Sequence, residues 1–259
     1  MLLAIDVGNT HTVIGAFNNE TLVADWRMAS VTHRTADENW LTIKSFCTDA
    51  GIDLATITGV GISSVVPDLT FVYKQLARKH FHVEPLSVSG ELPLGIRIAY
   101  SDPSMVGADR ICNAVAGYKR YGGPLIIIDF GTATTYDVVS AEGDYLGGVI
   151  TLGLESMATE LHRRAAKLPR VELRFPRKVI GNDTAASMQS GLMLGTVDAV
   201  EGMVRRIREE LGAPARVIAT GGLSTIIARH TTVIEACEPS LVLDGIRMIY
   251  DRLRPAAGS

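Results

Sequence analysis

Two stretches of the sequence share an aspartate, a glycine turn and hydroxyl side chains. The first is residues 5–12 (IDVGNTHT), the second is residues 128–135 (IDFGTATT), and nearly half the chain separates them. Glycine lets the backbone approach a phosphate closely, exposed N–H groups hold its oxygens, and an aspartate at a strand end can bind Mg²⁺ through water. A simple turn explains one such stretch equally well. Two of them, one in each half, predict a pair of loops that grip a polyphosphate from opposite sides.

A third glycine motif follows the apolar run 217–219 and reads TGGLS over residues 220–224. Paired glycines at a strand end leave room for a flat ring such as adenine or for a ribose, and a tight strand-to-helix turn explains them equally well. Ser224 is placed to cap the next helix. The sequence contains neither the P-loop pattern G-x-x-x-x-G-K-[ST] nor the dinucleotide pattern G-x-G-x-x-G, which excludes those two phosphate sites.

An acid and a base stand side by side in GADR, residues 107–110, at the expected start of a helix. Arg110 can clamp a carboxylate or phosphate, and Asp109 can accept the proton of a substrate hydroxyl, as carboxylates do in many phosphoryl transfers. The helix start and Arg110 would lower the pKa of Asp109, whereas burial would raise it. We expect an ionised carboxylate at neutral pH. Taken alone, these residues are more simply explained as a capping aspartate beside a surface arginine.

The remaining titratable residues show no comparable pattern. The six histidines lack metal-ligand spacing, and His80 and His82 are interpreted as a solvated loop pair rather than a metal site. His11, inside the first glycine turn, either contacts phosphate or faces solvent. The Lys and Arg residues between 163 and 178 could attract an anion, but a solvated helix face and loop is favoured. Cys112 is interpreted as a small core residue.

Composition places the chain among ordinary globular proteins. It has 259 residues, of which 47% are hydrophobic and 20% charged, with a formal net charge of −3. We expect no nucleic-acid partner, because such proteins usually carry a clustered positive surface. We expect no membrane contact either, since the longest apolar runs fall far short of the ~20 residues that a span needs. Three scattered cysteines fit a reducing compartment, so we expect a cytoplasmic location.

Hydrophobic patterning arranges the motifs on two similar halves. In the first half, Thr35 and Glu38 can form a capping box and Gly51 ends the helix that they open. The strands predicted there are 2–5, 12–17, 21–28 and 57–63, and the helices are 37–50 and a segment from Pro67 to about 79. In the second half the predicted strands are 125–128, 134–140, 145–150 and 217–219, and the helices are 154–166, 184–211 and 241–253. A helix over 108–121 would bridge the halves.

Both halves read β-β-β-α-β-α, which predicts an α/β fold with mixed rather than purely parallel sheets. We divide the chain into a domain over 1–115, with the first phosphate loop, and a domain over 116–259, with the second loop and the adenosine motif. Along the helix 184–211, apolar residues recur at helical spacing and line either the core or a dimer surface: Met188, Leu192, Val197, Val200 and Val204.

With these motifs in one order, the sequence resembles the type III pantothenate kinases, a family of the acetate kinase, sugar kinase, Hsp70 and actin superfamily. The resemblance covers nearly the whole chain. GADR shortly before DFGTATT is specific to this family, whereas paired phosphate loops occur across the superfamily. The motifs that carry the resemblance are DVGNT (6–10), GADR (107–110), DFGTATT (129–135), GGVI (147–150), GNDT (181–184) and TGGLS (220–224).

The resemblance implies two actin-like, or ribonuclease H-like, domains with five-stranded sheets and a cleft between them. It implies an ATP-dependent kinase that transfers the γ-phosphoryl group to the primary hydroxyl of pantothenate, giving 4'-phosphopantothenate in the first step of coenzyme A biosynthesis. A second hypothesis keeps the fold and changes the acceptor, although GADR and GNDT together argue against it. A third makes the chain a non-catalytic, nucleotide-binding transcriptional accessory protein on the same fold.

The resemblance also assigns roles to single residues. Asp109 matches the proposed general base, Asp129 matches a ligand of a monovalent cation (K⁺ or NH₄⁺), and Asp6 would lie near Mg²⁺, bound through water. The matching ATP-binding positions are Asp6, Val7, Gly8, Asn9, Thr10, His11, Thr12, Val13 and Thr132. The matching pantothenate-binding positions are Tyr100, Gly107, Ala108, Asp109, Arg110 and Thr184.

Members of this family are homodimers in which the second subunit helps to close the pantothenate site, so the resemblance implies a homodimer. Two positions depart from the family's pattern. Leu152 stands where the family usually has Pro, and Ala165 stands where it often has Thr. Neither departure alters an aspartate of the predicted site or the GNDT motif.

Overall fold

The computed structural model describes residues 1–254. Their contacts divide the chain into two compact units. Unit 1 consists of Met1–Lys119 together with the C-terminal segment that begins at Ser240, and unit 2 consists of Arg120–Pro239. The expected division near residue 115 put the last helix in the second domain. In the structure this helix packs on the sheet of unit 1. As a boundary between two related domains, that division stays a prediction.

The sheet of unit 1 is mixed, as the sequence predicts. Its strands lie in the order β3-β2-β1-β4-β5. The β1–β2 and β2–β3 pairs are antiparallel, whereas the β1–β4 and β4–β5 pairs are parallel. All but the two-residue β5 were predicted, with ends shifted by a residue or two. The strand bounds are β1 Leu2–Val7, β2 His11–Asn18, β3 Thr21–Ala29, β4 Gly59–Ser64 and β5 Leu86–Ser87.

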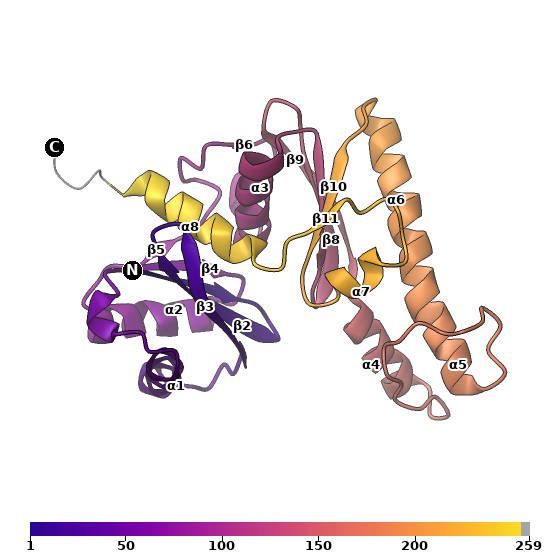
Figure 1. Ribbon diagram of the computed structural model, residues 1–259, viewed down its shortest axis with the longest axis horizontal. Helices are drawn as coiled ribbons and strands as arrows, with labels where there is room; N and C mark the ends of the chain where they lie inside the picture. Colours follow the sequence, from indigo (N-terminus) through magenta and orange to yellow (C-terminus); the bar gives the residue numbers. More distant parts are fainter. Residues whose placement is uncertain (255–259) are drawn as a thin grey trace. The chain divides into compact units, whose positions relative to one another are not determined.

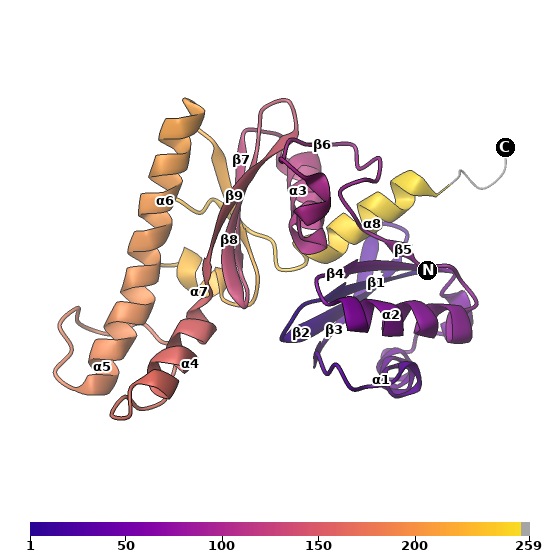
Figure 2. The ribbon, with the colours of Figure 1, turned by 180° about the vertical axis from the view of Figure 1, so that it is seen from behind.

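Helices cover both faces of this sheet (Figures 1 and 2). The helices α1 (Ala36–Asp49) and α2 (Pro67–Leu76) pack on one face, where every second side chain of β1 joins the apolar core. The C-terminal helix α8 (Leu241–Leu253) contacts β1, β2 and β4. Because successive strand residues point to opposite faces, one set of β1 side chains faces α1 and α2 and the other faces α8.

Glycines on β4 explain how closely α8 approaches the sheet. A Cβ atom at Gly59 would stand 2.1 Å from Tyr250 Oη, and one at Gly61 would stand 2.5 Å from Ile246 Cγ2. These separations are far below ordinary van der Waals contact, so only glycine fits at either position while α8 keeps its place.

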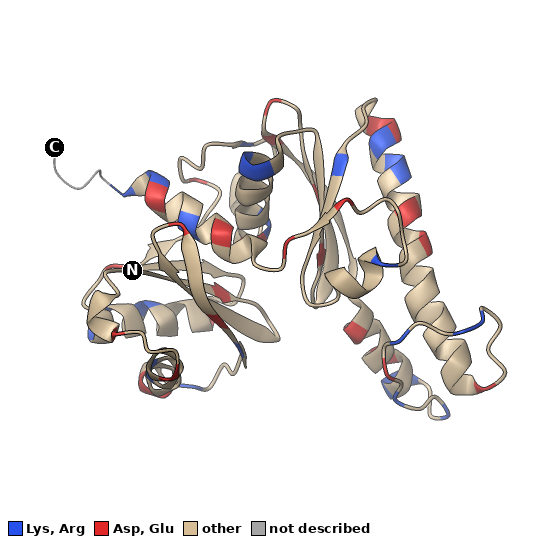
Figure 3. Ribbon diagram, viewed as in Figure 1, with Lys and Arg blue, Asp and Glu red and all other residues tan. Residues whose placement is uncertain are grey.

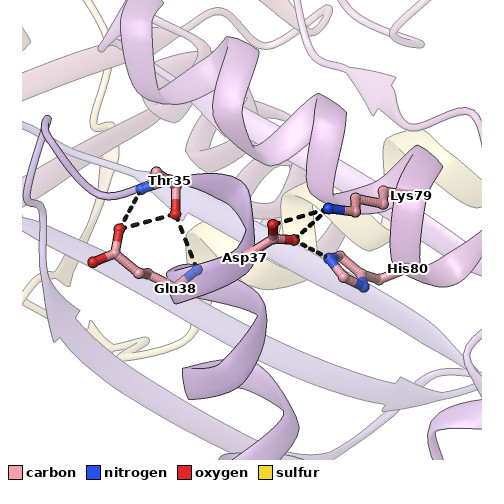
Figure 4. Close-up of polar contacts among 5 residues, drawn as sticks. All are labelled: Thr35, Asp37, Glu38, Lys79 and His80. Carbon is pink, nitrogen blue, oxygen red and sulfur yellow. Dashed lines mark hydrogen bonds and ion pairs between the residues drawn. The ribbon is translucent and has the colours of Figure 1, made fainter.

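The first helix begins as the sequence predicts. Thr35 Oγ1 accepts a hydrogen bond from Glu38 N (3.3 Å), and Thr35 N donates to Glu38 Oε2 (2.8 Å), which completes the capping box shown in Figure 4. Gly51, which follows the end of α1, has φ of +69°, a left-handed conformation that favours glycine.

The rest of unit 1 consists of short elements and one long helix. The predicted helix from Pro67 continues past α2 as a π-helical segment, η2. The predicted helix over 108–121 is confirmed as α3. The bounds of these elements are η1 Leu54–Thr56, η2 Ala77–Phe81, β6 Arg97–Ile98, η3 Pro103–Met105 and α3 Ala108–Tyr121.

Unit 2 repeats the arrangement of strands seen in unit 1. Its own strands lie in the order β11-β10-β7-β8-β9, with antiparallel β7–β8 and β8–β9 pairs and parallel β7–β10 and β10–β11 pairs. Four were predicted, and the two-residue β11 was not. The strand bounds are β7 Leu125–Phe130, β8 Ala133–Val139, β9 Asp144–Leu152, β10 Arg216–Thr220 and β11 Ala236–Cys237.

One face of this second sheet packs against the long helix α6 (Figure 1). The predicted helix over 184–211 is three consecutive segments, with a π-helical turn in the middle. The apolar residues at helical spacing along it belong to the core of unit 2, which decides between the two interpretations of that pattern. The helix bounds are α4 Leu154–Arg164, α5 Thr184–Gln189, η4 Ser190–Leu194, α6 Gly195–Leu211 and α7 Ser224–Ala228.

Among residues 1–254, no helix has both the length and the apolar character that crossing a membrane requires.

Strand register confirms that the two sheets are copies of one pattern. Asp6 of β1 lies opposite Val13 of β2, and Asp129 of β7 lies opposite Thr135 of β8. On the parallel side, Asp6 pairs with Ser63 of β4, as Asp129 pairs with its counterpart on β10. The second hairpin of each unit even has its irregularity at the same place, after residue 16 in one and after residue 138 in the other.

Candidate active site

The first glycine motif forms the tip of the β1–β2 hairpin. Gly8 N donates to His11 O (3.0 Å) and closes the turn. The backbone of this turn is tied to the end of β3, because Ser30 N donates to Thr10 O (2.9 Å) and Ser30 Oγ donates to Gly8 O (2.6 Å). Thr12 Oγ1 lies 2.9 Å from Ser30 Oγ. Since the Ser30 hydroxyl proton goes to Gly8, Thr12 supplies the proton of this last bond.

Ser30 is a residue that sequence analysis missed. It lies in a stretch without any motif, and its contact with the turn arises only once β3 pairs with β2. Its three hydrogen bonds hold the shape of the loop, so we interpret Ser30 as a residue that positions the predicted phosphate-binding backbone.

The predicted ATP-binding residues of this loop divide by exposure. The side chains of Asn9, Thr10 and His11 are exposed at the tip. Val7 and Thr12 are each 0% exposed, and their side chains serve the core and the Ser30 contact. These two positions can therefore offer only backbone groups to a ligand. Gly8, Val13 and Asp6 are half-buried at the base of the loop.

Asp6 and Asp109 lie near one buried thiol of unit 1. Ser63 Oγ donates to Asp6 Oδ1 (2.7 Å) across the β1–β4 pair. Burial raises the pKa of the Cys112 thiol well above its usual value, and the charges of Asp6 and Asp109 raise it further. Both carboxylates are therefore within electrostatic reach of Cys112. The prediction that Cys112 is a small core residue is confirmed, since it is 0% exposed.

The GADR motif bends at the start of α3 so that the carboxylate of Asp109 turns back on its own backbone. Arg110 N donates to Asp109 Oδ1 (2.8 Å). A Cβ atom at Gly107 would stand 2.5 Å from the same oxygen, so the glycine makes room for this conformation. Ala108 and Arg110 are buried, and Ile111 N donates to Gly107 O (3.1 Å) in the first helical turn.

The pKa of Asp109 is higher than that of an ordinary aspartate. Desolvation by burial raises it, and the Arg110 N–H and guanidinium lower it only in part. The sequence left the sign of this shift open, because it could not weigh burial against the arginine. A carboxylate with a raised pKa is a stronger base, which suits proton abstraction from an alcohol.

The remaining predicted pantothenate-binding residues lie in different units. Tyr100 is exposed in unit 1, ahead of the turn that Asp102 caps through Ser104 N (3.0 Å). Thr184 is exposed on the first turn of α5 in unit 2. Asp183 caps that helix through Ala186 N (2.7 Å), so the GNDT motif is a helix start that presents Thr184.

The second glycine motif follows β7 and closes like the first. Gly131 N donates to Ala133 O (3.1 Å). Gly153 N and Ser156 Oγ both donate to Thr132 O, at 3.0 and 2.9 Å, so the start of α4 supports this loop. A Cβ atom at Gly153 would stand 2.1 Å from Gly131 O, which makes this glycine indispensable to the contact. The family departure at the preceding residue, Leu152, leaves β9 regular to its end.

The TGGLS motif meets the second loop inside unit 2. Gly221 has φ of +86°, and a Cβ atom there would stand 2.5 Å from Asp129 Oδ1 and 2.6 Å from Phe130 O. The glycine thus lets a carboxylate oxygen and a carbonyl oxygen pack directly against the turn. The expected capping role of Ser224 is wrong, because its hydroxyl donates to Gly221 O (2.8 Å) and so stabilises the turn before α7 instead.

The histidine pair is only partly the solvated loop that the sequence indicates. His80 Nε2 lies 2.8 Å from Asp37 Oδ1, and its ring stacks on Trp40. Lys79 Nζ also donates to Asp37 (2.8 Å), as Figure 4 shows. These hydrogen bonds from Lys79 and His80 lower the pKa of Asp37. They join α1 to η2 and have no contact with the predicted ligand loops.

The basic run over residues 163–178 includes the last two residues of α4 and continues along the segment that leads to α5 (Figure 3). Arg163 and Arg164 both pair with Glu160, at 2.9 Å, on the exposed face of α4. All the Lys and Arg side chains of this run are exposed, in agreement with a solvated helix face and loop. Among residues 1–254, no three His, Cys, Asp or Glu side chains form a metal-binding group.

Two α/β units with matched strand registers, each with an Asp–apolar–Gly turn after its first strand, define the class of the protein. They are two actin-like α/β domains. Solved structures support this fold. A putative Baf family transcriptional activator from Campylobacter jejuni superposes with a TM-score of 0.63 at 15% identity, covering 96% of this chain and 98% of that one. A putative N-acetylmannosamine kinase from Listeria monocytogenes superposes with a TM-score of 0.56 at 10% identity, covering 98% and 99%.

Sequence relatives narrow the class. The family model described as type III pantothenate kinase matches residues 2–206. A type III pantothenate kinase of Roseiflexus castenholzii is 48% identical over 254 residues, which cover 98% of this chain and all of the relative. One from Thermomicrobium roseum is 45% identical over 259 residues, covering all of both chains. The chain belongs to the type III pantothenate kinase family.

Proposed function

We propose that this protein is an ATP-dependent pantothenate kinase, which transfers the γ-phosphoryl group to the primary hydroxyl of pantothenate. Full-length relatives of this family support the reaction. The observation that carries the proposal is the environment of Asp109, a half-buried carboxylate with a raised pKa that shares the surroundings of Cys112 with Asp6. This environment supports a base that acts near the strand end from which the first phosphate loop begins.

Asp109 acts as the general base. Its carboxylate accepts the proton of the pantothenate hydroxyl as the oxygen attacks the γ-phosphorus, and ADP leaves with the electron pair of the broken P–O bond. Phosphoryl transfer needs mainly alignment and stabilisation of charge, so a modest base in the right place is sufficient. The Arg110 N–H bond to Asp109 Oδ1 fixes the orientation of the carboxylate.

Pantothenate is held by the residues around that base. Gly107, Ala108 and Arg110 supply the start of α3, whose backbone N–H groups and positive helix end favour the carboxylate of the substrate. Tyr100 supplies an exposed ring and hydroxyl ahead of them. Thr184, at the start of α5, is assigned to pantothenate by the family's GNDT motif alone.

ATP is held by the two glycine turns. The backbone and the exposed side chains of residues 9–11 at the tip take phosphate oxygens, while Ser30 keeps the turn in shape. In the second turn, Thr132 is exposed at the tip and its carbonyl is held by the start of α4, which supports a phosphate contact at this residue.

Both aspartates at the strand ends fit metal ions by the chemistry of their donors. Carboxylate and carbonyl oxygens are ligands that Mg²⁺ and K⁺ accept, and one of each, Asp129 Oδ1 and Phe130 O, packs against Gly221. Asp129 would hold a monovalent cation, K⁺ or NH₄⁺, and Asp6 would hold Mg²⁺ through water. When bound, these ions neutralise charge on the phosphates.

We also propose a homodimer in the cytoplasm. Val179 and Ile180 are 72% and 87% exposed, directly before the GNDT motif, and large apolar side chains so exposed are typical of a covered surface. A second copy over this segment would bring Thr184 into the contact as well. All three cysteines are free thiols, which supports a reducing compartment.

A coupled ADP-release assay tests the function. We expect release that saturates with pantothenate, depends on K⁺ or NH₄⁺, and yields one 4'-phosphopantothenate per ADP by mass spectrometry. Release that requires another alcohol instead would show a different acceptor. Nucleotide binding without turnover under all these conditions would favour the non-catalytic regulator and contradict the proposal.

A further inference from the structure

A buried carboxylate in unit 2 has no part in the function proposed so far. Asp137 of β8 is 0% exposed. It accepts a hydrogen bond from Tyr145 Oη (2.8 Å) and another from Thr135 Oγ1 (3.0 Å). Tyr145 is also 0% exposed, so the carboxyl group and the tyrosine hydroxyl are removed from water together, while Thr135 is half-buried. Burying such groups is costly unless they are satisfied, and both hydroxyls donate to the carboxylate.

The fold itself does not require this carboxylate. By strand register, the position of Asp137 in unit 2 corresponds to Gly15 in unit 1, since each lies two residues after the partner of the strand-end aspartate. Thr135 likewise corresponds to Val13, and Tyr145 corresponds to Leu22. Unit 1 builds the same sheet with an entirely apolar set at these three positions. The hydrogen-bonded set of unit 2 therefore serves something that unit 1 lacks.

The direction of the hydrogen bonds shows what Thr135 can do. A threonine hydroxyl has one proton and two acceptor lone pairs, and Thr135 gives its proton to Asp137. Its oxygen is then an acceptor only. A phosphate oxygen, which needs a donor, gains nothing from such a group, whereas a cation does.

Thr135 is well placed to meet a cation at Asp129. The two residues lie directly opposite each other in the antiparallel β7–β8 pair, so their side chains share one face, with Cβ atoms about 4.5–5.5 Å apart. Asp129 Oδ1 and Phe130 O in turn both pack against Gly221. A carboxylate, a carbonyl and an acceptor-only hydroxyl are the kind of hard oxygen set that alkali cations take.

We propose that Asp137 is a positioning residue for the monovalent-cation site: by taking the Thr135 proton, it fixes the Thr135 oxygen as a ligand beside Asp129. Tyr145 anchors Asp137 from the other side. The inference deepens the proposed function and depends on its cation. It adds two residues, Asp137 and Thr135, to a site for which the family resemblance supplies only Asp129.

Binding of K⁺ is measured directly, by thermal stabilisation of the full-length protein in KCl–choline chloride mixtures of constant ionic strength. Asp137→Asn places an amide N–H₂ group against the hydroxyl of either Thr135 or Tyr145, which both donate to Asp137. The half-saturating K⁺ concentration should rise about 10–100-fold, as is typical when a metal ligand loses its hydrogen-bond partner. Thr135→Val should do the same, whereas Thr135→Ser keeps the oxygen and should bind K⁺ like wild type. Glu142→Gln, on the exposed turn of the same hairpin, is the matched control.

The double variant Asp137→Asn/Thr135→Val should bind K⁺ no more weakly than Thr135→Val alone, because Asp137 acts through Thr135. A lower melting temperature with an unchanged half-saturating K⁺ concentration in Asp137→Asn or Thr135→Val would overturn the proposal and leave a structural role. A wild-type protein that phosphorylates pantothenate but shows no saturable response to K⁺ would also overturn it, while leaving the proposed kinase function intact.

Discussion

At the scale of single residues, the account depends on Asp109 and its raised pKa. Burial makes the ionised form less stable in the folded protein than in water, and the neighbouring arginine compensates only in part. The folded state therefore holds the proton of Asp109 more tightly than the unfolded chain does. The same shift that makes the carboxylate a better base makes the folded protein less stable at neutral pH.

Asp109→Asn should therefore stabilise the protein while abolishing most of its activity. Asparagine resembles the protonated acid and keeps the bond from Arg110 N. Because the pKa is raised on folding, the stability associated with the protonated group is present at low pH and is lost as pH rises through the folded-state pKa. The variant should exceed wild type in free energy of unfolding at pH 7, and the difference should shrink as pH falls toward the pKa of an ordinary aspartate. Urea unfolding at several pH values measures both, and a variant less stable than wild type at pH 7 would contradict the pKa direction.

Ser30→Ala tests the support of the first loop. The variant loses the hydrogen bond to Gly8 O and the acceptor for the Thr12 hydroxyl. We expect a loss of about 1–3 kcal/mol in the free energy of unfolding, since Thr12 is fully buried. The Michaelis constant for ATP should rise with little change for pantothenate. Ser104→Ala, in an exposed turn, is the control, and equal effects on both substrates would show that Ser30 does not act through the loop.

At the scale of elements, much of each unit was readable from the sequence. The capping box of Thr35 and Glu38 and the long strands carry strong local signals, and the structure confirms them. The two-residue strands β5 and β11 have no periodicity to detect. Ser30 and Asp137 were missed for another reason, because their contacts depend on strand register, which motifs do not encode. The prediction for Ser224 was wrong because its hydroxyl donates to the nearby carbonyl of Gly221 and does not accept from an N–H group of the helix.

Gly221→Ala tests the packing of the TGGLS turn on the second loop. The new methyl group would clash with Asp129 Oδ1 and Phe130 O, and the backbone has a positive φ that alanine disfavours. We expect a loss of about 1–3 kcal/mol in the free energy of unfolding together with weaker ATP binding. Gly202→Ala is the control, since nothing lies within 4 Å of its Cβ position on α6. That change should instead stabilise the protein by up to about 1 kcal/mol. Equal and small effects of both variants would contradict the close contact.

At the scale of the whole molecule, the chain is a duplicated unit in which each copy keeps its aspartate and glycine turn but specialises the rest. Unit 1 adds Asp109 on α3, and unit 2 adds the hydrogen-bonded set around Asp137. The duplication was visible in the repeated motifs. The packing of α8 on unit 1 was not predictable, because the sequence of a C-terminal helix does not indicate on which sheet it packs.

Ile180→Asp tests the proposed homodimer. A charge at this highly exposed apolar position would be costly inside a contact between subunits and harmless in a monomer. Sedimentation velocity should show a dimer for wild type and a shift toward monomer for the variant, with unchanged thermal stability of the isolated subunit. If Thr184 of one subunit contacts the pantothenate bound to the other subunit, the affinity for pantothenate should also be lower in the monomeric variant. A variant that sediments as wild type would place the contact elsewhere.

The most direct test of the account is a single-turnover experiment with Asp109→Asn. Rapid quench with saturating ATP and pantothenate measures the transfer step, and separate titrations measure the affinity for each substrate. If Asp109 is the base, the transfer rate should fall on the order of 10²–10⁴-fold while both affinities stay near wild type. Transfer at a rate close to wild type would remove Asp109 from the chemistry and contradict the central claim.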